Sequence, residues 1–563
     1  MKNDKKTPPL FWQRRQWLLL IFVLSILILL WRAVYLQIMH KDFLQTQGEV
    51  RHLRTIPLMA HRGSLFDRNG ELLAMSTPVE SVWINPKQFI TEKSRWKKLA
   101  ILLQLTLSQL ETKVQKRKNY EFVYIKRHIP PHLAQKVRDL NLSGVFLQRE
   151  YRRYYPMAEM TSHVLGFTNI DDKGQEGLEL ALNQFLTGLS GEKQVIQDKY
   201  GQIIAELGSQ QLPQSGQDIY LSLDRRLQYY AYRELKTAVK QHRAKSGSAV
   251  ILDAKTGEVL AMVNQPAYNP NNRQQRQANH YRNRAVTDVF EPGSTAKPFT
   301  IAAALKTKHY LPYSKVNTSP GKLQLGKYTV KDSYNYGSIS LRKILQKSSN
   351  VGASKVALSL NQSKYWSTLA DFGFGHISNS GFPGEASGRL PHYAEWNKVL
   401  NATLSFGYGL NVTTLQLARA YAVFAHHGIL PPVHFLSQQN KTVIDFHTKP
   451  QQIIAPHIAQ QVLNMLETVV GEGGTGQAAN IQGFRVAGKT GTARKFMQGK
   501  YSDSAYLSLF VGIAPVTQPR LVMAVIIDEP RGESYYGGEV AAPIFAKVMA
   551  NALRLLNIAP DNL

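Results

Sequence analysis

The longest uninterrupted apolar stretch of the chain lies close to its N-terminus. Residues 17–31 read WLLLIFVLSILILLW with Ser25 as the one polar side chain, and the apolar pattern continues to Met39. A helix of this length can cross a bilayer, and no small-x-small cleavage site follows it, as a cleaved signal peptide would require. Five basic residues against one acidic residue precede it, and the positive-inside rule keeps such an end inside the cell. The pattern predicts a cytoplasmic tail over residues 1–16 and a transmembrane anchor over residues 17–39.

The rest of the chain divides into two modules by its pattern of apolar and polar positions. In the first, residues 50–218, Asn69-Gly70 lies between two apolar runs and predicts a β-hairpin. Residues 98–116 repeat apolar positions with a helical period, and residues 201–218 are rich in Gly, Gln, Pro and Ser, as linkers are. The first module is therefore expected to mix helices and strands and to end in a linker.

The second module, residues 219–555, begins and ends with strand-like runs. Residues 248–263 form two apolar runs across a Lys-Thr-Gly turn, and three more runs follow much later, at residues 484–495, 505–515 and 519–528. Helical segments fill the interval, and one more closes the module. Strands at both ends with helices between them predict an α+β domain, in which helices cover a five-stranded, mostly antiparallel sheet.

Composition narrows the classes of site and partner. The chain has 563 residues and no cysteine, which excludes disulfides, thiol nucleophiles and cysteine-ligated metals. Its formal net charge is +29, but the basic residues are scattered and match no zinc-finger spacing or aromatic RNA-binding signature. We therefore expect no nucleic-acid partner, no metal site and no cofactor. The charge is interpreted as a basic surface beside an anionic membrane or polymer.

Ser294 and Lys297 are the strongest candidates for chemistry. Ser-x-x-Lys occurs five times in the chain, and the other four copies are interpreted as helix caps or solvated polar faces. Only at Ser294 does Pro-Gly precede the serine and an apolar helical run follow it, with Lys297 one turn further on the same face. A serine becomes nucleophilic when a base takes its proton. Lysine acts as that base only if burial or a second cation lowers its pKa.

Two later motifs supply groups that such a pair requires. Lys489 lies in AGKTGTA within a strand-like run and is a candidate second cation, and Gly491 there permits close approach of another segment. The third motif is Ser348-Ser349-Asn350. Each motif is frequent by chance, whereas all three in this order and in these predicted elements form a strong signal.

Together the three motifs resemble those of penicillin-binding proteins and serine β-lactamases. The segments RGSLFDRNGELLA, SFGYGLNVTTLQLARAYA and YYGGEVAAPIFAKVM extend the resemblance over nearly the whole chain, to the division-specific class B penicillin-binding proteins (FtsI type, penicillin-binding protein 3). Ser349 departs from the Asp usual in β-lactamases, and that departure is typical of the class B group. The resemblance implies a non-catalytic pedestal over residues 50–218 and a transpeptidase domain over residues 219–555.

The resemblance also implies a reaction, D,D-transpeptidation through a serine acyl-enzyme. Ser294 would attack the penultimate D-Ala carbonyl of a stem peptide with Lys297 as its base, and an amine of a second stem peptide would then take the acyl group. Ser348 would relay a proton to the leaving group, and Asn350 would hold Lys297 and the peptide. β-Lactams mimic D-Ala-D-Ala and would acylate the same serine.

The last motif is expected to bind substrate. By resemblance, Lys489, Thr490 and Thr492 would hold the terminal carboxylate of the stem peptide, and Gly491 belongs to the same substrate-binding strand. The backbone N–H groups of Ser294 and Thr492 would form the oxyanion hole.

Location and partners follow from the resemblance as well. It implies a single-pass protein of the bacterial inner membrane with a periplasmic catalytic domain, acting on peptidoglycan stem peptides beside a SEDS-type glycan polymerase (FtsW) and other divisome proteins. The alternatives are an elongation-specific class B transpeptidase, a β-lactamase, and a non-catalytic β-lactam-binding scaffold or sensor. No segment identifies the water-activating base that a β-lactamase would need.

Five further residues receive structural interpretations. Arg62, Asp67 and Glu176 are expected to hold the first module together rather than to do chemistry. Tyr535 and Tyr536 either wall the cleft or are surface aromatics at the end of a strand.

Overall fold

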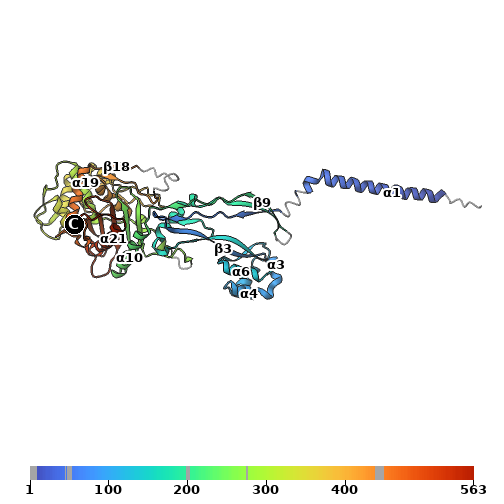
Figure 1. Ribbon diagram of the computed structural model, residues 1–563. Coiled ribbons are helices and arrows are strands. Elements are labelled where there is room, and N and C mark those ends of the chain that lie inside the picture. The colour runs from blue at the N-terminus through green and yellow to red at the C-terminus, as the bar shows by residue number, and fades with distance from the viewer. Residues whose placement is uncertain are drawn as a thin grey trace, which may run out of the picture. The chain divides into compact units, whose positions relative to one another are not determined.

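The computed structural model describes residues 9–44, 46, 53–197, 203–273, 277–437 and 449–562 (Figure 1). The chain forms two compact units. Unit 1 comprises Met1–Ala60, Glu80–Glu150 and Leu189–Ser215, and unit 2 comprises His61–Val79, Tyr151–Gly188 and Gly216–Leu563. Two segments of the predicted first module therefore pack with the second module, inside unit 2.

Unit 1 begins with the apolar helix that the sequence predicts. The helix α1 (Pro9–Val34) and the π-helical turn η1 (Tyr35–Met39) follow one another, and the apolar side chains from Trp17 to Trp31 are exposed. Within the described residues, Trp12–Met39 is the one helical stretch long and apolar enough to cross a membrane. A helix that is apolar all round, with none of its side chains in a protein core, is suited to lipid.

An antiparallel sheet in unit 1 overturns the linker prediction. Its strands follow the order β1 (Leu53–Leu58), β8 (Gly191–Gln197) and β9 (Ile203–Gln211). The strand β9 lies within residues 201–218, so the linker prediction is wrong for Ile203–Gln211. Strand pairing is made by backbone N–H and C=O groups that nearly every residue carries, so a composition rich in Gly, Gln and Ser did not reveal it.

The rest of unit 1 packs helices against strands. Phe89 and Trp96 stack in its core with ring centroids 4.9 Å apart. Residues 98–116, predicted as helical, contribute to two helices, because Thr106 begins the second one with a capping box to Gln109. The elements here are α3 (Pro86–Phe89), α4 (Trp96–Leu102), α5 (Leu107–Gln115), β4 (Val123–Ile129), α6 (Pro131–Asp139) and β5 (Val145–Tyr154), which continues into unit 2.

The hairpin predicted at Asn69-Gly70 is confirmed. The strand β2 (Leu65–Phe66) pairs antiparallel with β3 (Leu72–Ile84), and Gly70 has φ +84° in the turn between them. Asp67 accepts backbone N–H bonds from two residues of this turn, at 2.8 and 2.9 Å. Its role is to hold the turn, as expected of a structural residue.

The second module contains the predicted five-stranded sheet. Its neighbouring strands are all antiparallel, in the order β12 (Val259–Gln265), β11 (Ser246–Asp253), β21 (Leu521–Asp528), β20 (Lys500–Ala514) and β19 (Ala487–Met497). The helices α10 (Arg225–Gln241) and α21 (Ala542–Leu555) pack together on one face (Figure 1). The helix α18 (Thr414–Ala425) covers the other face. The predicted α+β fold is confirmed.

Helices and short strands around α18 complete unit 2. They bury a second, larger cluster of apolar side chains on that side of the sheet. The main ones are β10 (Ile219–Tyr220), α12 (Arg284–Thr287), α13 (Lys297–Lys306), β15 (Tyr328–Lys331), α14 (Leu341–Lys347), α15 (Asn350–Ser359), α16 (Gln362–Asp371), α17 (Lys398–Leu404) and α19 (Pro456–Val470).

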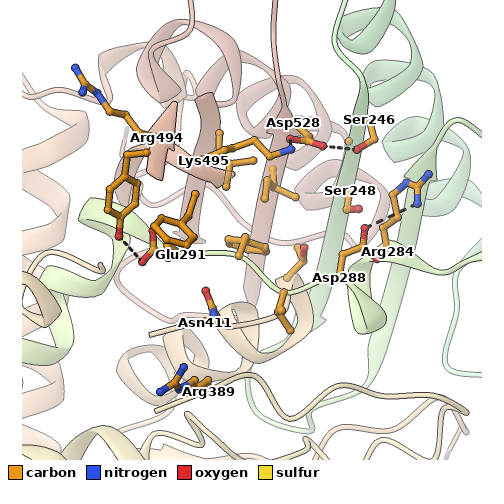
Figure 2. Close-up of a pocket in the computed structure, with 18 of the residues that line it drawn as sticks. Ser246, Ser248, Arg284, Asp288, Glu291, Arg389, Asn411, Arg494, Lys495 and Asp528 are labelled. Carbon is orange, nitrogen blue, oxygen red and sulfur yellow. Dashed lines mark hydrogen bonds and ion pairs between the residues drawn. The ribbon is translucent and has the colours of Figure 1, made fainter. Parts of the chain in front are cut away.

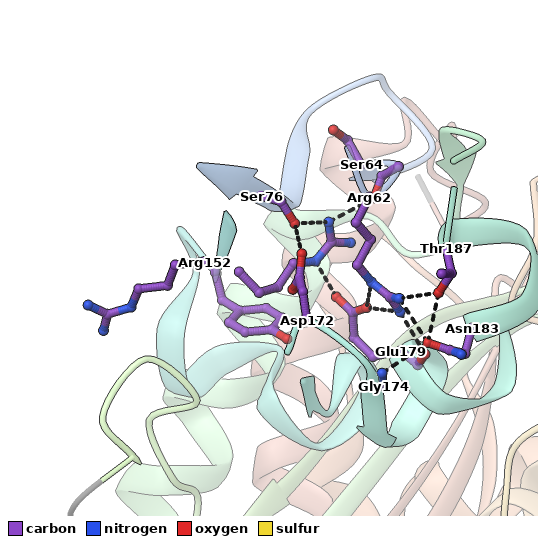
Figure 3. A network of polar contacts seen from close by, with 12 residues as sticks. Arg62, Ser64, Ser76, Arg152, Asp172, Gly174, Glu179, Asn183 and Thr187 are labelled. Atoms are coloured by element: carbon purple, nitrogen blue, oxygen red, sulfur yellow. Dashed lines mark hydrogen bonds and ion pairs between the residues drawn. The ribbon is translucent and has the colours of Figure 1, made fainter. Parts of the chain in front are cut away.

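A buried ion network joins the parts of unit 2 that come from the first module (Figure 3). Arg62 donates to Glu179 Oε2 from Nε and Nη2, at 2.9 and 2.7 Å, and Arg153 donates to Glu179 Oε1 at 2.6 Å. Glu176, which the sequence suggested for a role of this kind, is exposed. That prediction is right for Arg62 and wrong for Glu176, because spacing alone does not tell which of two nearby carboxylates points inward.

Replacing Glu179 by glutamine is expected to destabilise the protein strongly. Two buried guanidinium groups would lose the carboxylate that neutralises them. Removing one partner of a buried ion pair lowers the free energy of unfolding by roughly 3–5 kcal/mol. The measurement is the unfolding midpoint of the detergent-solubilised chain. Asp503→Asn is the control, since that side chain is 90% exposed in its ion pair with Arg494; equal midpoints for the two variants would contradict the prediction.

Candidate active site

Ser294 lies where the chain turns into α13. It belongs to the 3₁₀ turn Gly293–Ala296, whose end continues directly into the helix. Gly293 has φ +54°, and a Cβ on Gly407 would come within 2.1 Å of the Gly293 carbonyl oxygen. Two glycines thus let two backbone segments pack closely beside the serine.

The ammonium nitrogen of Lys297 connects the first two motifs. Lys297 is fully buried. Its Nζ lies 2.8 Å from Ser294 Oγ, 3.1 Å from Ser348 Oγ and 2.7 Å from Asn350 Oδ1. It also donates to the backbone oxygen of Ser348 at 2.7 Å. The structure therefore brings three of the predicted site residues, Ser294, Ser348 and Asn350, within hydrogen-bond distance of the Nζ atom of a fourth, Lys297.

The surroundings of Lys297 favour its neutral form. Burial lowers the pKa of Lys297 well below its usual range, the charge of Lys489 lowers it further, and Asp332 acts in the opposite direction. Burial also lowers the pKa of Lys489, to about 7. Lys489 Nζ donates to Ser348 Oγ at 3.0 Å, so one hydroxyl contacts both amines. The third motif thus places a second amine beside this pair, as the sequence predicts.

Ser348 occupies a strained backbone position between two helices. It follows α14 with φ +57°, a conformation uncommon for a residue with a side chain. Ser349 caps α15 by accepting the N–H of Gly352 at 2.9 Å. Asp332 accepts from Ser349 Oγ and from Asn350 N, both at 2.5 Å. Sequence reasoning missed Asp332, since no motif marks it, although it anchors the whole Ser-Ser-Asn turn.

The strand β19 runs close beside the turn Gly293–Ala296 that carries Ser294. A Cβ on Gly491 would come within 2.9 Å of Thr295 Cγ2, so the glycine permits the approach that its position in the sequence predicts. Thr490 is buried, whereas Thr492 is partly exposed and its Oγ1 accepts the N–H of Gly537 at 3.0 Å. The strand therefore carries the third motif along the edge at which Ser294 lies.

Tyr535 and Tyr536 flank this strand. Tyr535 stacks on Tyr506 with ring centroids 4.0 Å apart and on Tyr536 at 4.6 Å. The next residue, Gly537, is the one that donates to Thr492. The two tyrosines therefore immediately precede the residue that contacts the third motif.

Comparison with known proteins identifies the family. The family model described as "Penicillin binding protein transpeptidase domain" matches residues 247–550, and the one described as "Penicillin-binding Protein dimerisation domain" matches residues 57–221. The chain belongs to the penicillin-binding protein transpeptidases. The enzyme class of this family is the serine-type acyltransferase, as the Ser294 motif predicted.

Two curated relatives match almost the whole chain. It is 43% identical over 535 residues to the "Probable peptidoglycan D,D-transpeptidase PenA" of Neisseria meningitidis, covering 94% of this chain and 90% of that one. It is 41% identical over 547 residues to the "Peptidoglycan D,D-transpeptidase FtsI" of Escherichia coli K12, covering 96% and 91%. The resemblance to FtsI-type proteins is confirmed.

Solved structures agree with this assignment. Penicillin-binding protein 3 of Mycobacterium tuberculosis, in complex with aztreonam, aligns with a TM-score of 0.70 at 26% identity and covers 90% of this chain and 98% of its own. The transpeptidase domain of penicillin-binding protein 3 from Burkholderia pseudomallei aligns with a TM-score of 0.55 at 39% identity, covering 61% and 97%.

Among the described residues, no group of three or more His, Asp or Glu side chains is arranged to hold a metal ion.

The Asp332→Asn variant is expected to shift the pH dependence of penicillin acylation. The carboxylate of Asp332 raises the pKa of Lys297, so removing its charge lowers that pKa and moves the acidic limb of the rate profile to lower pH. The measurement is the second-order rate of fluorescent-penicillin labelling from pH 5 to 9. Ser349→Ala serves as control, because it removes one partner of the carboxylate but keeps the charge; an unchanged limb in Asp332→Asn would contradict the prediction.

Proposed function

We propose that the chain is a membrane-anchored peptidoglycan D,D-transpeptidase that cross-links stem peptides of the septal cell wall and is acylated by β-lactams. The observation that carries this proposal is the position of Lys297 Nζ, 2.8 Å from Ser294 Oγ, in a buried site that lowers its pKa. Relatives named as a probable or established peptidoglycan D,D-transpeptidase support it over 94–96% of the chain.

Acylation begins when the neutral amine of Lys297 takes the proton of Ser294 Oγ. The oxygen forms an ester bond with the carbonyl carbon of the penultimate D-Ala, and the peptide bond to the terminal D-Ala breaks. The leaving amine receives a proton through Ser348 Oγ, which contacts both Lys297 and Lys489. Asn350 Oδ1 holds the Lys297 amine during these transfers.

The third motif binds the donor peptide and its oxyanion. Lys489 as a cation, with Thr490 and Thr492, holds the terminal carboxylate, and Gly491 keeps this strand close to the nucleophile turn. The backbone N–H groups of Ser294 and Thr492 stabilise the oxyanion, and one such donor is typically worth ~100–1,000-fold in rate. An amine of a second stem peptide then attacks the ester, forms the new peptide bond and regenerates the serine hydroxyl.

The proposed location of each part of the chain is inferred from the transmembrane anchor. Residues 17–39 span the inner membrane, the tail 1–16 is cytoplasmic, and the pedestal 50–218 and transpeptidase domain 219–555 lie in the periplasm. The partners in the membrane are a SEDS-type glycan polymerase (FtsW) and other divisome proteins. Support for a division role comes from the relatives named FtsI.

Two experiments test the proposal. The detergent-solubilised chain is expected to release D-Ala from a synthetic pentapeptide stem and to form a peptide dimer. If a preparation that penicillin labels stoichiometrically forms neither product, the protein is a β-lactam-binding scaffold and not a transpeptidase. Depletion in cells is expected to give filaments, and round cells would indicate an elongation enzyme. Rapid release of bound penicillin would instead favour a β-lactamase.

A further inference from the structure

The reaction proposed above brings two peptides to one serine, a donor and an acceptor. In that mechanism the donor is held by β19, and a groove of about 510 Å³ extends from this strand. Figure 2 shows Glu291 and Arg494 in the wall of this groove. A different segment, the Ser-Ser-Asn turn, reaches Ser294 through Lys297. Groups beside that turn are therefore placed to meet the acceptor.

A small hairpin lies next to the Ser-Ser-Asn turn in the fold. Its strands are β14 (Lys322–Leu325) and β15 (Tyr328–Lys331), which pair antiparallel. The loop between them has two residues, Gly326 and Lys327, as the tightest hairpins have. The hairpin is therefore a compact unit with a defined register.

Hydrogen bonds attach this hairpin to the reaction centre. The carbonyl oxygen of Lys331 accepts from Asn350 Nδ2 at 3.1 Å. Asn350 Oδ1 accepts from Lys297 Nζ at 2.7 Å, and Lys297 Nζ lies 2.8 Å from Ser294 Oγ. Three hydrogen bonds thus lead from the nucleophile to the end of β15.

One face of the hairpin is polar and cationic. Lys322 lies directly opposite Lys331, and Gln324 lies directly opposite Thr329. Because side chains alternate between the two faces of a strand, these four point to the same side, and all four residues are exposed. Val330, on the other face, is buried, and β15 packs against α15. The cationic face is therefore the one turned to solvent.

The protein does not neutralise these two lysines. Directly opposite residues of an antiparallel pair have Cβ atoms roughly 4.5–5.5 Å apart, and like charges at such positions repel each other. Neither ammonium group makes a hydrogen bond or ion pair with the described residues. Asp332 is the only acidic residue between positions 306 and 355, and its carboxylate is held by Ser349 and Asn350. An anion bound between the two lysines would offset their repulsion.

We propose that Lys322 and Lys331 bind a carboxylate of the acceptor stem peptide, the peptide whose amine attacks the acyl-enzyme. An extended peptide advances roughly 3.3 Å per residue, so an acceptor with its amine at the Ser294 ester carries its carboxylates towards the end of β15. The inference rests on the proposed transpeptidase function and adds a requirement to it. Acceptors with free carboxylates react faster than acceptors whose carboxylates are amidated.

The test compares two acceptors on the full-length, detergent-solubilised chain. One is N-acetyl-L-Ala-γ-D-Glu-L-Lys, which has one free amine and two carboxylates, and the other is its diamide. The donor is N,N′-diacetyl-lysyl-D-Ala-D-Ala, which has no carboxylate upstream of the D-Ala pair, so a charge effect comes from the acceptor. The acceptor amine and water compete for the same acyl-enzyme. In either case the ester bond to Ser294 Oγ breaks and the attacking group returns a proton to that oxygen. The readout is the ratio of peptide product to hydrolysed donor.

The wild-type chain is expected to give a ratio about tenfold higher with the acidic acceptor than with the diamide. Lys322→Gln and Lys331→Gln are each expected to lower the ratio for the acidic acceptor about threefold, and together about tenfold, as the loss of exposed ion pairs does. The ratio for the diamide, the rate of D-Ala release and penicillin labelling are expected to stay within about twofold. Lys240→Gln, at an exposed lysine near the end of α10, is the control and is expected to change none of them.

The outcomes distinguish this inference from the proposed function. Equal ratios for the two acceptors in the wild type, or a preference that the double variant retains, would overturn the acceptor site and leave the transpeptidase function standing. Equal losses with both acceptors in the double variant would also overturn it, because the substitutions would then act through Asn350 and not through charge. If the wild-type chain transfers the acyl group to neither acceptor, the proposed function fails, and this inference fails with it.

Discussion

The Ser294→Ala variant is expected to form no covalent adduct with fluorescent penicillin. The ester of the acyl-enzyme requires Oγ of this residue, and no other serine lies 2.8 Å from the Lys297 amine in the described part of the chain. Removing the nucleophile of a serine acyltransferase costs on the order of 10⁶-fold in rate, which places labelling below detection. The measurement is gel fluorescence together with intact mass.

A matched control is available in the same chain. Ser94 also stands three residues before a lysine, Lys97, but both side chains are exposed in unit 1. Ser94→Ala is expected to label like the wild type. Stoichiometric labelling of Ser294→Ala, with the adduct mass on another residue, would contradict the assignment of the nucleophile.

The second large effect concerns the two buried lysines, which are expected to give a bell-shaped pH profile of acylation. Lys297 is a base only when neutral, so the rate rises as pH passes upward through its lowered pKa. Lys489 attracts the substrate carboxylate only as a cation, so the rate falls as pH rises through its pKa of about 7. Burial and the charge of Lys489 lower the pKa of Lys297 and Asp332 raises it, whereas burial alone accounts for the lowered pKa of Lys489.

Substitution separates the two limbs. Lys297→Ala is expected to lower the acylation rate by about 10²–10⁴-fold, the usual contribution of a general base, and to remove the acidic limb. Lys489→Ala is expected to remove the alkaline limb. It is also expected to weaken the binding of substrates that carry a carboxylate. Lys97→Ala, the exposed counterpart, is the control. A wild-type rate that stays flat between pH 5 and 9 would refute the role given to both amines.

The local elements of this fold could be predicted because their signals lie within a few residues of one another. The apolar run of α1, the Asn69-Gly70 turn and the strand-like apolar runs of β11, β12 and β19–β21 each express local structure through neighbouring side chains. The linker prediction failed at Ile203–Gln211, where strand pairing depends on backbone groups and on a partner strand. Glu176 was expected to help hold the first module together, whereas Glu179 is the buried carboxylate of the ion network, since inward orientation is a property of packing.

The linear chain was sufficient to single out candidates for the residues that carry the chemistry. The Ser294, Ser348 and Lys489 motifs were found from residue types, order and predicted elements, and all three lie within residues 247–550, which the family model matches. The distances between these residues and the pKa values of their side chains could not be predicted from the sequence. A pKa depends on burial and on charges brought in from distant segments, and only the folded chain places Lys489 beside Ser348 Oγ and turns Asp332 towards the Ser-Ser-Asn turn.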